Sequence, residues 1–172
     1  PADINETLEC WEIALKSKNT PSVIALSRQK VPYVNPDNSK KNKCENGAYE
    51  VKITSHESNV TLIASGTEVD LALKVQNKLK ENNIHSKVIS MPCMELFDNQ
   101  SEKYKKNLIE ENSLIVTLEA GSITSWQKYI KNKGLNLGID QFGESAPYKE
   151  VYDHFYLTEE KITNFIQKKL RE

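Results

Sequence analysis

One arginine near the start of the chain is the residue best suited to bind a ligand. The chain has 23 basic residues, and only Arg28 and Arg171 are arginines, the second at the very end of the chain. Arg28 closely follows the apolar run Ser22–Leu26, which is typical of a buried strand, so we expect a rigid scaffold to hold it. A guanidinium can bind a phosphate through two parallel hydrogen bonds, which lysine cannot do. The pattern therefore indicates either a phosphate ligand or an ion pair with a carboxylate at a domain edge.

Two carboxylates and one glycine turn are weaker candidates for chemistry. Glu119 and Asp140 each follow an apolar run that is typical of a strand, and a pair of carboxylates can carry out acid–base catalysis. The alternative is that each caps a nearby backbone group or meets a lysine. Gly66-Thr67 lies between an expected strand and helix, where backbone N–H groups can hold an anion. Because this turn matches neither GxGxxG nor a Walker A loop, a glycine needed for backbone geometry is the simpler interpretation.

The cysteines and histidines show no metal-binding pattern. Cys10, Cys44 and Cys93 are odd in number, lie far apart in the sequence and form no CxxC pair. They also lack metal-ligand spacing with the three histidines, which are His56, His85 and His154. Cys93 follows Pro92 near an expected helix start, which can lower a thiol pKa, but no general base is nearby. We therefore predict structural free thiols in a reducing, cytoplasmic setting.

Composition restricts the classes of protein to which the chain can belong. Its 172 residues are 38% hydrophobic and 27% charged, which suits one compact domain, or one domain and a piece of another. The net charge of −1 gives no electrostatic reason to bind nucleic acid or an anionic membrane. No apolar run approaches the roughly 20 residues that span a bilayer. Because the sequence starts with Pro1 and shows no signal peptide, we expect it to begin inside a longer protein.

The first part of the chain predicts a helix and a strand without a core of their own. An apolar stripe at helical spacing predicts a helix over residues 5–17, and its members are Ile4, Leu8, Trp11 and Leu15. Asp3 or Asn5 can cap this helix. The strand at 22–27 follows, and then a polar segment at 30–46 that is typical of a linker. One helix and one strand cannot close a core, so we expect them to dock on the rest of the chain or on a second copy.

Strands and helices alternate regularly after Gly47. The expected strands, of which the first is an edge strand with one wet face, are 49–53, 60–64, 87–91, 114–118 and 135–139. The expected helices start after Thr67 and then span 98–111, 123–132, 148–154 and the region after 158. We therefore predict an α/β fold: a three-layer sandwich with a mostly parallel sheet of about five strands, one antiparallel edge strand, and helices on both faces.

A set of short segments resembles transketolase, in the order in which that family has them. Pro1–Glu6 and Ser27-Arg28-Gln29 with Pro32 resemble the end of its pyrimidine-binding domain. Other segments resemble its C-terminal domain, namely Gly47–Tyr49, Ile63–Val69, Val88–Pro92 with Glu95–Phe97, Glu119–Ser122 with Trp126, and Gly138–Gly143 with Ser145–Pro147. The last is the most diagnostic. Together with Ser-Arg-Gln, it favours transketolase over sister families that share this domain, such as deoxyxylulose-phosphate synthase and the β subunits of 2-oxoacid dehydrogenases.

The resemblance implies a transferase that uses thiamine diphosphate and moves a two-carbon ketol unit between sugar phosphates in the pentose phosphate pathway. It implies a homodimer in which Mg²⁺ or Ca²⁺ holds the cofactor diphosphate, with no nucleic acid or membrane partner. The cofactor, metal and catalytic residues of the family belong to domains that precede this sequence. Arg28 matches the family's arginine that binds the substrate phosphate. We therefore expect one substrate-binding residue here, no catalytic, cofactor or metal residue, and no activity of the chain alone.

The resemblance also divides the chain. Residues 1–36 are expected to be the end of the pyrimidine-binding domain, 37–47 a linker, and 48–172 the C-terminal domain. In the family that last domain is thought to support the dimer, and a regulatory role has been suggested. Two alternatives from other classes are a non-catalytic interaction module and a nucleotide- or anion-binding domain that uses Gly66-Thr67.

Overall fold

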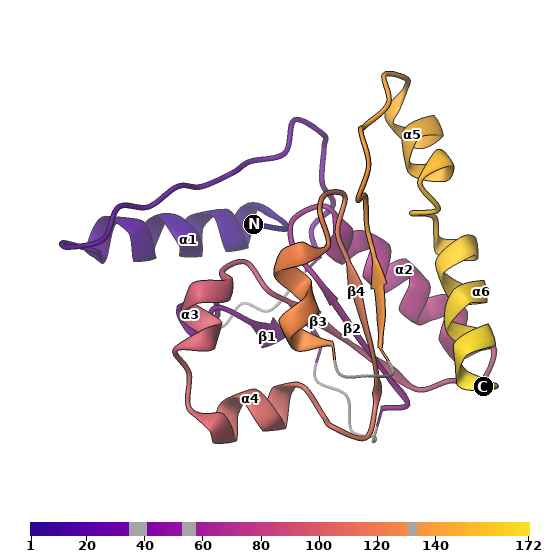
Figure 1. Cartoon of the computed structure of the whole chain (residues 1–172). Coiled ribbons are helices and arrows are strands. Elements are labelled where there is room, and N and C mark those ends of the chain that lie inside the picture. The colour runs from indigo at the N-terminus through magenta and orange to yellow at the C-terminus, as the bar shows by residue number, and fades with distance from the viewer. Residues whose placement is uncertain (35–40, 53–57, 131–133) are drawn as a thin grey trace.

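The centre of the molecule is a five-stranded sheet with the strand order β1-β3-β2-β4-β5 (Figure 1). The structure is a computed structural model, and it describes residues 1–34, 41–52, 58–130 and 134–172. The strands are β1 (Tyr49–Glu50), β2 (Val60–Ala64), β3 (Ser86–Ser90), β4 (Leu114–Leu118) and β5 (Leu135–Leu137). All pairs are parallel except β1 with β3, which is antiparallel and forms one edge. The predicted sheet is confirmed, but the edge strand expected at 49–53 ends at Glu50, residues 51–52 form a bend, and residue 53 lies outside the described residues.

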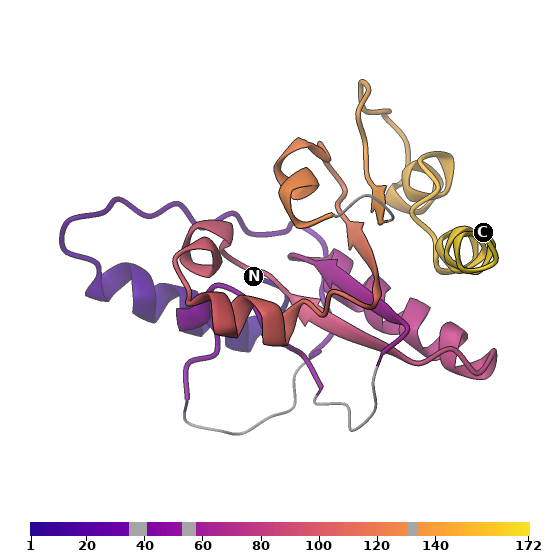
Figure 2. The same ribbon diagram turned by 60° about the horizontal axis from the view of Figure 1, so that its bottom comes forward.

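Helices cover both faces of this sheet, as predicted (Figure 2). On one face lie α2 (Glu68–Glu81) and α6 (Glu159–Leu170), which pack against each other. On the other face lie α3 (Met94–Asp98), α4 (Glu102–Leu108) and the 3₁₀ helix η2 (Thr124–Tyr129). A further helix, α5 (Tyr148–His154), precedes α6 and extends beyond the sheet in Figure 1. No helix in the described ranges is long and apolar enough to cross a membrane.

The central strand β2 is buried along its whole length. Side chains alternate between the two faces of a strand, so each face needs its own apolar partners. Leu62 packs in the cluster under α2 and α6, whereas Ile63 packs in the other, with Phe97 and Trp126. A continuous apolar run is what a strand covered on both sides requires, and it explains why 60–64 and 114–118 were predicted with correct bounds.

Two predicted helices differ in form. The expected helix at 98–111 is shorter, because α3 ends at Asp98, and Ser101 adopts an extended backbone and accepts the N–H of Tyr104 through its hydroxyl at 3.2 Å. This side-chain cap starts α4 as a separate helix. The expected helix at 123–132 is the 3₁₀ helix η2, which ends at Tyr129 and buries Trp126. Both segments still supply the apolar residues that cover the second face.

The N-terminal helix α1 (Ile4–Lys16) forms as predicted but docks through the other face. Its N-cap is Asp3, whose side chain accepts the N–H of Glu6 at 2.9 Å. The apolar stripe remains exposed, by 61% at Ile4, 62% at Leu8, 50% at Trp11 and 78% at Leu15. Of the two outcomes that we expected for the stripe, docking on the rest of this chain is therefore wrong, and docking on a second copy stays a prediction. The carboxylates on the opposite face make the contacts instead, because they find backbone N–H groups and hydroxyls to accept.

The expected strand at 22–27 is also wrong. The segment is extended, but none of its backbone groups is hydrogen-bonded to another backbone group in the described part of the chain. Val23 is 96% exposed and Leu26 is 60% exposed. An apolar run shows that a segment can be a buried strand, but a strand also needs a neighbour with which to pair. Here that neighbour does not lie among the described residues.

Candidate functional site

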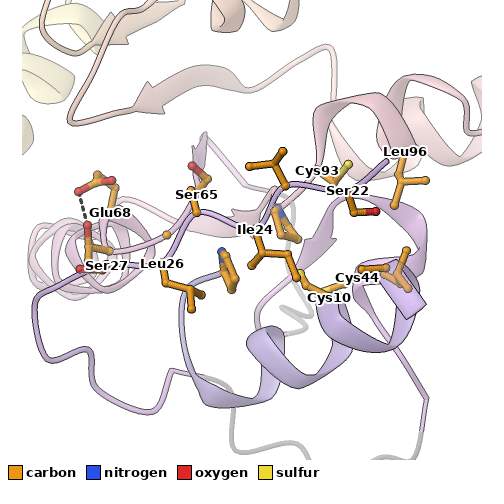
Figure 3. Close-up of a pocket in the computed structure, with 18 of the residues that line it drawn as sticks. Cys10, Ser22, Ile24, Leu26, Ser27, Cys44, Ser65, Glu68, Cys93 and Leu96 are labelled. Carbon is orange, nitrogen blue, oxygen red and sulfur yellow. Dashed lines mark hydrogen bonds between the residues drawn. The ribbon is translucent and has the colours of Figure 1, made fainter. Parts of the chain in front are cut away.

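A cavity of about 450 Å³ lies at the carboxyl ends of β2, β3 and β4 (Figure 3). Its floor is formed by the residues that follow these strands, including Ser65 and Glu119. Its walls come from α1 and from the extended segment 22–27. Ligands of open α/β sheets bind beyond the carboxyl ends of the strands, so this is the expected place for a site. Its volume is within the range of small-molecule pockets.

Two carboxylates meet at this cavity, but they are not the predicted pair. Glu119 Oε2 accepts hydrogen bonds from Trp126 Nε1 at 3.0 Å and from Ser65 Oγ at 3.3 Å. Burial raises the pKa of Glu119, and the nearby Glu68 raises it further. Glu68 is buried at the start of α2, and its Oε1 accepts the hydroxyl of Tyr152 at 2.6 Å. Glu68 and Glu119 become neighbours only in the folded chain, and their spacing in the sequence did not predict this.

Asp140 has a structural role. Its Oδ1 accepts the Ser122 hydroxyl at 3.3 Å and the N–H of Ile123 at 3.4 Å, just before η2. It is exposed and is not part of the cavity lining. Asp140 therefore caps a local backbone group, as one of the two alternatives predicted. Glu119 and Asp140 do not form an acid–base pair.

The glycine turn before α2 is poorly suited to an anion. Gly66 has φ +54°, a left-handed conformation that favours glycine, so its place in the turn is explained by geometry. The hydroxyl of Thr67 donates to Glu68 Oε1 at 2.7 Å instead of capping the helix. Glu68, Asp70 and Glu119 place negative charge around this helix start. They would repel a phosphate, so the anion-binding alternative loses its support.

Arg28 is exposed in a bend directly after the extended segment. Among the described residues its guanidinium forms neither a hydrogen bond nor an ion pair. The ion pair that we considered as an alternative is therefore not present within the described part of the chain. The next residues, Gln29 to Pro32, lie against α2 and Tyr152 and line a second cavity of about 390 Å³. The guanidinium is thus on the surface, and the chain that follows it is anchored at Val34, which is buried in the core and donates its N–H to Asp3.

A row of carboxylates on α1 fixes the N-terminal segment to the sheet. Glu6 is 1% exposed and accepts three hydrogen bonds, from the Ala2 N–H at 2.6 Å, from the Tyr49 hydroxyl at 2.7 Å and from the Ser90 hydroxyl. The Oδ2 atom of Asp3 accepts the N–H of Val34 at 3.1 Å, which ties the start of α1 to the end of the segment that carries Arg28. Sequence reasoning missed this role.

A signal for the carboxylate row was present in the sequence. Acidic residues recur at every third position along α1 and its N-cap, at Asp3, Glu6, Glu9 and Glu12. Each lies beside the next on the helix surface, so the row was readable as an acidic band that winds around the helix. Its docking role was hidden because a row of charges is more often solvated than buried.

The cysteines are the second feature that the sequence did not reveal. Cys10, Cys44 and Cys93 are distant in the sequence, yet all three line the same cavity and all are free thiols. In the described ranges no group of three or more histidine, cysteine or acidic side chains could hold a metal ion. His154 is exposed, and its ring lies edge-on against Phe155 with ring centres 4.8 Å apart. His56 lies outside the described residues.

Comparisons with known proteins agree with this architecture. The sequence profile of the transketolase-like TK C-terminal domain matches residues 47–158. The chain is 38% identical to a transketolase of Aquifex aeolicus, in an alignment that covers 98% of this chain and 25% of that protein. It is 39% identical to a transketolase of Rhodobacter capsulatus, over 94% of this chain and 25% of that protein.

Solved structures give the same result. A transketolase from Pichia stipitis in complex with sedoheptulose 7-phosphate matches with a TM-score of 0.90 and 30% identity, over 99% of this chain and 24% of that one. A Campylobacter jejuni transketolase matches with a TM-score of 0.86 and 36% identity, over 98% of this chain and 25% of that one. This chain thus spans about a quarter of the length of these relatives. It belongs to the transketolase family and corresponds to the C-terminal part of its members.

Proposed function

We propose that the protein of which this chain is a part is a transferase that moves a two-carbon ketol unit between sugar phosphates in the pentose phosphate pathway. Within this chain, we propose that Arg28 binds the substrate phosphate. The observation that carries the proposal is an exposed guanidinium, without a partner among the described residues, beside a backbone that is anchored to the domain. A free guanidinium can make the two parallel hydrogen bonds that a phosphate accepts. The solved relatives include complexes with phosphorylated sugars, such as xylulose 5-phosphate and fructose 6-phosphate.

The test is kinetic and uses the intact transketolase that contains this chain. Arg28→Ala should raise KM for phosphorylated substrates by roughly ten-fold or more, since a charged hydrogen bond contributes about 1.5–3 kcal/mol. Substrates without a phosphate should be affected far less. Arg171→Ala is the matched control, because it removes the chain's other arginine, which is exposed at the end of the last helix. An equal loss for both classes of substrate would remove Arg28 from the phosphate role.

We further propose that thiamine diphosphate and its Mg²⁺ or Ca²⁺ are held by parts of the protein outside this chain. The residues described here do not fit that group. They include no cluster that could hold a metal, and the cavity carboxylates Glu68 and Glu119 would repel a diphosphate. On this basis the chain alone is inactive. Ketol transfer from xylulose 5-phosphate to ribose 5-phosphate, assayed with cofactor and Mg²⁺ added, would contradict the proposal if the purified chain gave clear turnover.

The proposed domain division keeps residues 1–36 as the end of a pyrimidine-binding domain, 37–47 as a linker and 48–172 as the C-terminal domain. Two observations support it. The family match begins at residue 47, beside the sharp turn at Gly47. Helix α1, with its exposed stripe, and the extended segment 22–27 have no sheet partner among the described residues. Part of the linker, 37–40, lies outside the described residues.

A homodimer is the second part of the proposal. The exposed stripe contains Trp11 and Leu15, and exposed apolar patches mark surfaces that other protein covers. Sedimentation equilibrium of the intact protein tests this, since a monomer at high concentration would contradict it. We also retain the cytoplasmic location as a proposal, which rests on the free thiols. Some plant relatives are named chloroplastic transketolases, so fractionation of cells is the check.

A further inference from the structure

Two of the three cysteines meet where α1 packs against the 3₁₀ helix η1 (Cys44–Asn46). Cys10 lies in the middle of α1 and is half-buried, whereas Cys44 starts η1 and is fully buried. Figure 3 shows their side chains next to each other at one end of the cavity. Both residues line this cavity, and α1 and η1 are in contact. Neither residue has a role in the proposed phosphate site.

Backbone contacts hold this pair in place. Glu9, the residue before Cys10, accepts the backbone N–H groups of Lys43 at 2.8 Å and Cys44 at 3.0 Å through Oε2. Asn42 donates from its side chain to the carbonyl of Glu9 at 3.0 Å. These bonds join the turn of α1 that contains Cys10 to the start of η1, where Cys44 lies. The two thiols are therefore held near each other by the fold.

The three thiols differ in their electrostatic surroundings. The neighbouring Cys44 thiol lowers the pKa of Cys10, and the Cys10 thiol together with burial raises the pKa of Cys44. Cys10 is therefore the group that ionises first, while Cys44 supplies a proton. Burial raises the pKa of Cys93, whose thiol instead faces Glu95 Oε2 at 3.5 Å. Because the thiolate is the nucleophile, reactivity is concentrated at Cys10.

We propose that Cys10 and Cys44 form a redox-active pair that a hydroperoxide converts into a disulfide, which links α1 to η1. The Cys10 thiolate attacks the peroxide O–O bond and becomes a sulfenic acid, and hydroxide leaves when the oxidant is hydrogen peroxide. The Cys44 sulfur then attacks the sulfenic sulfur, its proton passes to the departing oxygen, and water leaves. Two thiols are oxidised by two electrons and one peroxide is reduced to two waters. A dithiol reductant reverses the reaction by exchange.

The modification would change how the N-terminal segment is held. In the reduced chain α1 is attached by hydrogen bonds that can open, whereas the disulfide attaches it covalently. The segment that carries Arg28 follows α1, so oxidation would restrict it also. The inference stands independently of the phosphate role of Arg28, because it concerns only the thiols and the contact between α1 and η1.

The test treats the purified chain with equimolar hydrogen peroxide and then counts thiols and maps peptides by mass spectrometry. Free thiols should fall from three to one, and the linked peptides should contain Cys10 and Cys44. The reaction should be about ten-fold or more faster than in the chain unfolded in guanidinium, because the fold positions the sulfurs. Cys93→Ser is the control that keeps all residues of the pair, and it should form the disulfide at the same rate.

Three results would overturn the proposal. One is a linkage that includes Cys93, another is a disulfide between two copies of the chain, and the third is a rate equal to that of the unfolded chain. Cys10→Ser and Cys44→Ser should each abolish the internal linkage. The Cys93→Ser experiment decides the question even if either of these two variants folds poorly. Amide exchange in α1 should become slower after oxidation, and dithiothreitol should restore the original rate. This result would show that the disulfide attaches α1 to the rest of the chain.

Discussion

Removing the carboxylate of Glu6 should detach α1 from the sheet. In Glu6→Ala the Tyr49 hydroxyl, the Ser90 hydroxyl and the Ala2 N–H all lose their shared acceptor. Each hydrogen bond contributes about 1 kcal/mol net, and a buried donor left unsatisfied costs about 1–3 kcal/mol. Three such donors predict a loss of about 3 kcal/mol or more, which is a large share of the roughly 5–15 kcal/mol that stabilises a typical domain.

The conservative variant sharpens this prediction. Glu6→Gln preserves shape and one acceptor oxygen, but its NH₂ group then faces either the Ala2 N–H, which cannot accept, or the two hydroxyls, which would have to accept instead of donate. We expect a loss of about 1–2 kcal/mol, between wild type and Glu6→Ala. Glu12→Gln is the matched control on the same helix, since Glu12 is exposed and bridges to Lys16 at 2.7 Å. Surface pairs of that kind contribute at most about 1 kcal/mol, and often nothing measurable.

Urea denaturation gives the free energies, and amide exchange shows where the change lies. Exchange should accelerate mainly in α1 for both Glu6 variants, while the amides of β2 and β4 follow only the global stability. If Glu6→Gln and Glu6→Ala both cost no more than Glu12→Gln, the docking role that we assign to the buried carboxylate is refuted. The same holds if exchange accelerates equally in all elements.

Two further substitutions test the cavity and the turn before β1. Burial and Glu68 raise the pKa of Glu119 above its usual value of 4.5 in the folded chain, so its stabilising contribution is present at lower pH and is lost as pH rises through the folded pKa. As the pH rises from about 4 to about 7, the melting temperature of Glu119→Gln should therefore fall less than that of the wild type. Parallel profiles of melting temperature against pH would contradict this. Gly47→Ala should cost at least about 2 kcal/mol, because φ is +76° and an added Cβ would lie 2.2 Å from the Phe97 backbone N. Gly143→Ala is the control, since its added Cβ would meet nothing within 4 Å, and equal melting temperatures would refute the prediction.

The parts of the fold that the sequence predicted are those set by local pattern. β2 and β4 were located correctly because their continuous apolar runs are bounded by polar residues, and α5 because its segment is short and lies between a loop and a turn. The helix expected at 98–111 was predicted as one because its helical pattern continues across Ser101, although that residue caps a new helix. Local pattern does not specify the partner of an element, and for this reason the segment 22–27 was mistaken for a strand.

The site was harder to predict, because its members come together through topology. Arg28 was identified from its residue type, from the strand expected before it and from the family resemblance, and its exposure agrees with a ligand-binding role that remains a prediction. The approach of Glu68 to Glu119 depends on β2 and β4 being neighbours, which no spacing in the sequence encodes. The same applies to Cys10 and Cys44, which lie on two elements joined only through the docking of α1.

The buried Glu6 also has a consequence for the order in which the chain assembles. Tyr49 and Ser90, which both donate to it, are direct partners across the β1–β3 pair. Partner side chains lie on the same face of a sheet, and a slip of one residue would turn one of the two hydroxyls to the other side. The carboxylate can therefore find both donors only after β1 has paired in its native alignment. We therefore expect the docked α1 to stabilise only the native alignment of β1 with β3.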